Sequence, residues 1–244
     1  MKILAIETAT SICSVAIVGK DGFTIERHIN SKRMHSEKII FLIDECIEES
    51  KSDWHSINGI AVSIGPGSFT GLRIGLSVGK GLAYASGIPL VGIPTLFALA
   101  SQLIIKLKCS SEYLILPMID ARRDEVYCAL YEWKNGEVVE LQPPLAKSMD
   151  QILSSKIVER TVFVVGDGAE KFKEYCKKTA FDKSYSYIFP EGEVSNCNAI
   201  YVARMGLEKI SAGVCDDLSS LEPLYVKEFF TTGKKVKINM YKGN

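Results

Sequence analysis

The chain has 244 residues, of which 47% are hydrophobic, and its 29 Lys and Arg balance 29 Asp and Glu to a formal net charge of zero. A chain of this length can bury one large core or two smaller ones. The zero net charge excludes a general attraction to nucleic acid or membrane, so any RNA contact is local or supplied by a partner. Seven scattered cysteines without a Cys-x-x-Cys pair predict a reduced, cytoplasmic and metal-free protein.

The first segment predicts an antiparallel meander of three strands, at residues 2–7, 13–18 and 23–29. Its first turn carries Glu7 and Thr8, which suit either a metal and phosphate contact or a solvated hairpin with local hydrogen bonds. Both interpretations stay open.

A helix over 36–50 follows, with Ile39, Leu42 and Ile43 on its inner face. Its apolar arc is wider than one packing contact needs, which makes this helix a candidate interface. The uncharged stretch 81–105 is interrupted by Gly87, Pro89, Gly92 and Pro94, so it predicts two helices joined by a short strand and no membrane span.

The most distinctive stretch is Ser63-Ile64-Gly65-Pro66-Gly67-Ser68-Phe69-Thr70-Gly71-Leu72-Arg73-Ile74-Gly75. A buried strand leads into it, Ser68 is placed to cap a helix that runs to Ser86, and Gly87 suits a left-handed cap. The stretch lacks the Gly-Lys-Ser/Thr of a Walker A loop and the third glycine of a dinucleotide fingerprint.

The helix that begins there carries glycines at every fourth position, flanked by aliphatic side chains. Because glycine costs about 1 kcal/mol against alanine in a helix interior, such a stripe indicates that another backbone approaches closely. We favour a helix that packs on its own sheet with one flank and on another protein with the other, and the alternative is an internal helix pair. The predicted interface of the two helices comprises Ile39, Leu42, Ile43, Gly71, Leu72, Ile74, Gly75, Val78, Gly79 and Leu82. Gly75→Leu and Gly79→Leu are expected to block the partner while the lobes stay folded.

The strand pattern then restarts, with expected strands at 116–120, 125–133 and 137–141 and a second hairpin turn at Asn135-Gly136. This internal duplication implies two related lobes, 1–108 and 109–230, followed by a loose basic tail over 231–244. The second lobe continues with a helix over 149–155, a strand over 161–165, and a helix from Gly168 to Lys178. A last helix, capped by Asn196 and ending at Ser211, is a candidate to pack back on the first lobe. Gly166 and Asp167 suit either a nucleotide contact or, as we favour, an ordinary turn.

The duplicated meander and the thirteen-residue block resemble the family of bacterial tRNA threonylcarbamoyladenosine biosynthesis proteins called TsaB or YeaZ. The resemblance spans nearly the whole chain, through Ile6-Glu7-Thr8-Ala9-Thr10, Ile119-Asp120-Ala121-Arg122-Arg123-Asp124-Glu125-Val126-Tyr127, Val165-Gly166-Asp167-Gly168 and Glu222-Pro223-Leu224-Tyr225-Val226-Lys227. It implies the α/β, two-lobed fold of actin, sugar kinases and chaperone ATPases (the ASKHA fold).

The resemblance also implies a non-catalytic scaffold that supports its paralogue TsaD, the threonylcarbamoyl transferase, together with the ATPase TsaE. It implies no cofactor of this chain's own, since ATP belongs to the partners. The apolar helix surface predicts a homodimer when TsaD is absent, and the zero net charge predicts tRNA binding only through the complex. The metal-binding His-x-x-x-His pair of TsaD-like relatives corresponds here to Ile93 and Phe97, which cannot hold a metal. A vestigial nucleotide site at Glu7, Thr8, Asp120, Gly166 and Asp167 remains open, and the alternative function is a stand-alone phosphotransferase of the same fold.

Overall fold

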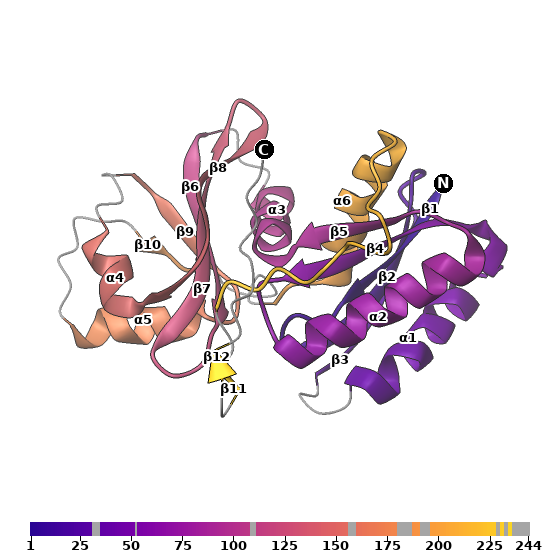
Figure 1. The fold of residues 1–244 in the computed structure, drawn as a ribbon. Helices are drawn as coiled ribbons and strands as arrows, with labels where there is room; N and C mark the ends of the chain where they lie inside the picture. Colours follow the sequence, from indigo (N-terminus) through magenta and orange to yellow (C-terminus); the bar gives the residue numbers. More distant parts are fainter. Residues whose placement is uncertain are drawn as a thin grey trace.

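Two five-stranded sheets form the framework of the molecule, one in each lobe (Figure 1). The computed structural model describes residues 1–30, 35–51, 53–107, 111–155, 160–179, 187–190, 196–227, 230–231 and 234–235. Most of the expected basic tail lies outside these residues.

The first sheet has the strand order β3-β2-β1-β4-β5. Its central strand β1 pairs antiparallel with β2, Ala5 opposite Ala16, and parallel with β4, Ala5 opposite Ala61. The strands are β1 (Lys2–Glu7), β2 (Ile12–Gly19), β3 (Thr24–Asn30), β4 (Ile57–Gly65) and β5 (Leu90–Pro94).

The second sheet has the order β10-β9-β6-β7-β8. Read outward from β6, it repeats the first sheet strand for strand, which confirms the predicted duplication and the two-lobed fold. The strands are β6 (Tyr113–Asp120), β7 (Glu125–Lys134), β8 (Glu137–Ser148), β9 (Val162–Val165) and β10 (Tyr187–Ile188).

Helices cover both faces of the first sheet (Figure 1). On one face lie α1 (His35–Glu49) and α2 (Phe69–Ser86), side by side, and on the other lies α6 (Ala199–Ser211). Helix α3 (Thr95–Leu107) lies between the two lobes, and α4 (Met149–Ser154) and α5 (Ala169–Lys178) lie on the outer side of the second sheet. A short 3-10 helix, η1 (Trp54–Ser56), precedes β4.

Helix α6 follows the second lobe in sequence but packs on the sheet of the first. A Cβ on Gly206 would collide with Ala61 on β4, so the helix and the sheet lie in close contact there. At the start of α6, the backbone N–H of Ala199 donates to Ser14 Oγ at 3.0 Å and that of Ile200 donates to Glu26 Oε1 at 3.2 Å. The sheet itself therefore satisfies N–H groups that the first turn leaves unpaired.

One apolar core extends through both lobes. Buried residues of the first sheet, such as Ala5 and Ile3, share a cluster with Ile115 and Tyr131 of the second, joined by α3 and α6. The junction between the lobes is therefore packed with side chains along α3.

The predicted caps of α2 are confirmed. Ser68 Oγ accepts a hydrogen bond from Gly71 N at 3.2 Å, and Gly87 ends the helix in the left-handed conformation, with φ of 65°. The predicted cap of α6 was wrong by two residues, because Asn198 and not Asn196 precedes its first turn. The prediction also missed β10 and the short pair β11 (Phe230–Thr231) and β12 (Lys234–Lys235), which lies where a loose tail was expected.

Candidate functional site

The glycine stripe of α2 faces the chain's own sheet. A Cβ on Gly71 would collide with the carbonyl oxygen of Thr8, one on Gly75 with the Thr8 hydroxyl, and one on Gly79 with Val62. Another backbone does approach the stripe closely, as predicted, but it is that of Thr8, which directly follows β1 in the same lobe. The expectation that these glycines admit a partner helix was therefore wrong, and leucines at 75 and 79 should disrupt the lobe itself.

Four more residues of the predicted interface also lie inside the lobe. Ile39, Leu42 and Ile43 on α1 and Leu72 on α2 are buried in the cores. Only Ile74, Val78 and Leu82 are half-buried, at the edge of the cluster beneath α2.

A different ridge of α2 faces outward. Arg73, Ser77, Gly81 and Ala85 are all exposed and recur every fourth residue, so they form one i, i+4 row. A Cβ on Gly81 would meet no atom within 4 Å. Ser77, Gly81 and Ala85 therefore form a shallow strip on which a partner helix can lie.

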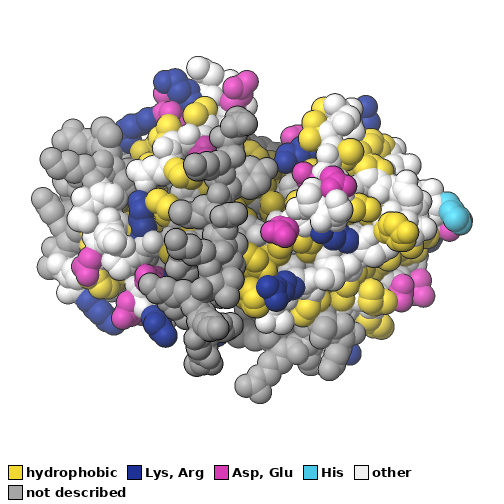
Figure 2. Space-filling model, in the orientation of Figure 1, with side chains coloured by type: hydrophobic (Ala, Val, Ile, Leu, Met, Phe, Trp, Pro, Cys, Tyr) yellow, Lys and Arg dark blue, Asp and Glu magenta, His cyan; other side chains and the backbone are white. Residues whose placement is uncertain are grey.

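Large apolar side chains are exposed on both α1 and α2. Tyr84 on α2 is 81% exposed, and Ile40 and Phe41 on α1 are 48% and 53% exposed. Figure 2 shows hydrophobic side chains gathered over these two helices, at the lower right of the molecule. We call this surface, made of the ridge, the half-buried aliphatic residues of α2 and these three side chains, the α1–α2 outer face.

Glu7 and Thr8 lie together at the end of β1, enclosed by the lobe. Both are fully buried. Glu7 Oε1 accepts a hydrogen bond from Ala9 N at 2.6 Å, and the Thr8 hydroxyl donates to the carbonyl of Gly71 at 2.8 Å. Burial raises the pKa of the Glu7 carboxyl to about 7, because desolvation disfavours the charged form.

Asp120, Gly166 and Asp167 lie together in the second lobe. Asp167 Oδ1 accepts a hydrogen bond from Asp120 N at 2.9 Å. Gly166 has φ of 97°, and a Cβ there would collide with the carbonyl of Met118. The Lys171 ammonium donates to Asp120 Oδ1 at 3.1 Å, so a basic group of the chain already pairs this carboxylate.

Cys197 is fully buried, two residues before α6. Burial raises the pKa of its thiol, and the negative charges of Glu7 and Asp167 raise it further, so Cys197 lies within electrostatic reach of both lobes. Of the positions that correspond to the metal ligands, Ile93 is buried in the core and Phe97 packs against it. Within the described ranges, no three His, Cys, Asp or Glu residues are grouped closely enough to hold a metal ion.

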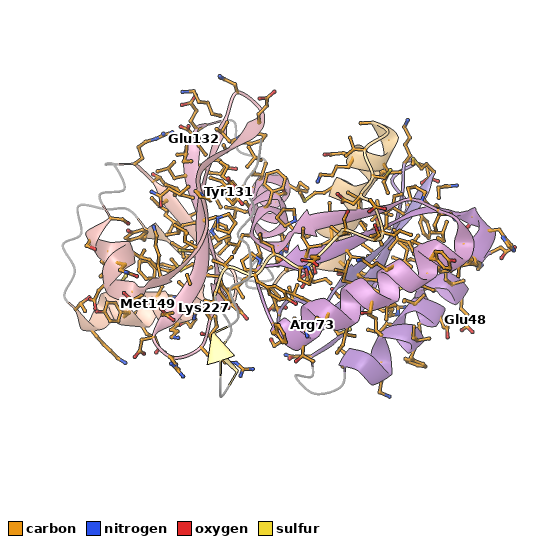
Figure 3. All side chains as sticks on the ribbon, in the orientation of Figure 1. Glu48, Arg73, Tyr131, Glu132, Met149 and Lys227 are labelled. Atoms are coloured by element: carbon orange, nitrogen blue, oxygen red, sulfur yellow. The ribbon has the colours of Figure 1, made fainter. Side chains whose placement is uncertain are left out.

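The segment Glu222–Lys227 crosses from the first lobe to the second. Leu224 N donates to the carbonyl of Ile64 at 2.7 Å. Three residues later, the Lys227 ammonium donates to the carbonyl of Ala121 at 3.0 Å and pairs with Glu125 Oε2 at 2.7 Å, which lowers the pKa of the Glu125 carboxyl. Figure 3 shows Lys227 in the second lobe and Arg73 at the start of α2, on either side of the junction.

None of the described helices is long and apolar enough to cross a bilayer.

The family model that matches the chain defines the class of protein to which it belongs. Residues 26–223 match the family model described as TsaD, tRNA N6-adenosine threonylcarbamoyltransferase. The chain is also 31% identical to the tRNA threonylcarbamoyladenosine biosynthesis protein TsaB of Escherichia coli (strain K12), over 93% of this chain and 95% of that protein. It is 28% identical to the TsaB of Bacillus subtilis (strain 168), over 93% of this chain and 94% of that protein.

The fold matches as well. YeaZ from Pseudomonas aeruginosa superposes with a TM-score of 0.74 at 22% identity, covering 92% of this chain and 99% of that one. The chain therefore belongs to the TsaB (YeaZ) family of tRNA threonylcarbamoyladenosine biosynthesis proteins, as the sequence resemblance predicted.

Proposed function

We propose that this chain is a non-catalytic scaffold of the tRNA threonylcarbamoyladenosine modification complex, and that it binds and supports the catalytic paralogue TsaD on its α1–α2 outer face. The main support is that face itself, because Ile40 and Phe41 of α1 and Tyr84 of α2 are exposed, and α2 also carries an exposed row of small residues. Exposed apolar surface of this kind is typical of protein interfaces.

The candidate nucleotide site supports the non-catalytic part of the proposal. The Glu7 carboxyl is enclosed and bonded to its own backbone, and Asp120 is paired with Lys171. A phosphotransferase needs carboxylates that face an open cleft and bind magnesium with the phosphates of ATP. In this proposal ATP is bound by the partners TsaD and TsaE and not by this chain. The tRNA binds to the assembled complex, which works in the cytoplasm.

The same outer face would pair with a second copy of this chain when TsaD is absent. Each buried aliphatic or aromatic side chain contributes about 1.5–3 kcal/mol before the costs of association, so leaving this face in water favours self-association.

Reconstitution of tRNA modification tests the proposal. Purified TsaD and TsaE of the same organism, supplied with ATP and threonylcarbamoyl-adenylate, should modify tRNA only when this chain is added. The chain alone should turn over neither compound. Turnover of either compound by the isolated chain at an enzyme-like rate would refute the scaffold role and favour the phosphotransferase. Full modification without the chain would refute it as well.

A further inference from the structure

Arg73 lies at the first turns of α2, held by two aromatic rings. Its guanidinium carbon is 3.9 Å from the centre of the Phe69 ring and 5.9 Å from that of Tyr225. The Arg73 Nε donates a hydrogen bond to the Tyr225 hydroxyl at 2.9 Å, and the two ring centres are 5.3 Å apart. Tyr225 belongs to the segment that crosses between the lobes, so residues far apart in sequence fix this side chain.

The guanidinium of Arg73 is bonded within the chain through Nε, and the residue is exposed. None of the ion pairs between described residues involves Arg73. A guanidinium fixed in this way loses little conformational entropy when its terminal N–H groups bind a carboxylate in the bidentate geometry.

The position of Arg73 indicates what it binds. It is the first member of the exposed ridge that continues with Ser77, Gly81 and Ala85. A helix packed along that ridge reaches Arg73 with its own side chains, because rows of i, i+4 residues pack into the grooves of a partner helix.

From these contacts we infer that Arg73 is an anchor for a carboxylate side chain on the partner helix that covers the α1–α2 outer face, and that Tyr225 is the residue that positions it. The inference rests on the proposed function and names the chemistry of the partner at one end of the interface. An RNA phosphate is the less favoured ligand, because the other three ridge residues are uncharged and the chain as a whole carries no net positive charge.

Affinity for TsaD, measured by titration with the full-length variants, tests this inference. Arg73→Ala should weaken binding about 10- to 100-fold, and Arg73→Lys should restore only part of the loss, because an ammonium cannot present two parallel N–H groups. Tyr225→Phe keeps the ring but removes the hydroxyl, so it should weaken binding about 3- to 10-fold. In the Tyr225→Phe background, the further loss on adding Arg73→Lys should be smaller than in the wild-type chain. The loss caused by Arg73→Ala should shrink at high salt.

Arg204→Ala is the matched control. Arg204 is also exposed and lies 6.0 Å from the ring centre of Tyr201, but on α6, away from the outer face. Its removal should leave TsaD affinity unchanged, and circular dichroism should show that every variant is folded.

The outcomes separate the two proposals. If Gly81→Leu abolishes TsaD binding while Arg73→Ala leaves it intact, the scaffold role stands and the anchor is refuted. If neither variant changes binding, the proposed face fails and the anchor fails with it. If Arg73→Ala preserves TsaD affinity but lowers tRNA retention by the complex, the ligand is a phosphate and the inference is overturned.

Discussion

The hydroxyl of Thr8, at the end of β1, donates a hydrogen bond to the carbonyl of Gly71 in the first turn of α2, at 2.8 Å. Both groups are enclosed where the helix meets the sheet, and the absent side chain of Gly71 is what lets the two backbones come together. The glycine stripe thus stabilises the lobe, and its effect should be measurable without any partner.

Gly71→Ala should lower the free energy of unfolding by about 3 kcal/mol, because its Cβ would overlap the Thr8 carbonyl and force the helix away from β1. Urea denaturation of the isolated chain, at a concentration low enough to keep it monomeric, measures this change. Gly81→Ala is the matched control, since its Cβ enters open space, and it should raise stability by up to about 1 kcal/mol. Equal destabilisation by both would show that the stripe is not packed as described.

Glu7→Gln should remove a pH dependence of stability. The folded pKa of Glu7 is raised from 4.5 to about 7, so the unfolded chain ionises first and the wild-type chain loses stability as pH rises from about 4.5 to about 7. At about 1.4 kcal/mol per pH unit the loss is about 3 kcal/mol. Glutamine keeps the acceptor for Ala9 N and carries no charge.

The measurement for Glu7 is the difference in unfolding free energy between Glu7→Gln and wild type, taken at pH 5 and at pH 8. The difference should shift in favour of the variant by about 2.5 kcal/mol between the two pH values, because the titration of the unfolded chain has already begun at pH 5. Taking the difference cancels the other titrating groups. A pH-independent difference would show that the carboxyl is not desolvated in solution.

Ser68→Ala should cost about 1 kcal/mol, because it leaves Gly71 N without its acceptor at the start of α2. Thermal or urea unfolding measures the loss. Ser77→Ala, at an exposed position on the same helix, should be neutral or slightly stabilising. If the two variants behave alike, the cap contributes nothing.

Local sequence signals predicted much of the fold. Asn135 and Gly136 both have positive φ, as a tight hairpin turn requires, and so revealed the duplicated meander. Ser68 accepts the hydrogen bond of an N-cap and Gly87 adopts the left-handed conformation of a C-cap, so these two residues marked the ends of α2.

The candidate site was harder to predict, because periodicity shows that a face is small or apolar but not what lies against it. Helix α2 carries two rows of small residues, one with Gly75 and one with Gly81, and only the structure shows that the first lies on Thr8 and the second faces outward. Asp120 and Lys171 pair across 51 positions of sequence, so no local sequence pattern predicts their contact.

Binding of TsaD to a Gly81→Leu variant tests the central claim most directly. Leucine at this position should stay compatible with the helix, since a Cβ there meets no atom within 4 Å, but its bulk stands in the middle of the ridge. Glu174→Leu places the same side chain at an exposed position of α5 and serves as the control. In sedimentation velocity, Gly81→Leu should lose both the TsaD complex and the homodimer while the control keeps them. Retention of both assemblies by Gly81→Leu would show that the α1–α2 outer face is not the interface.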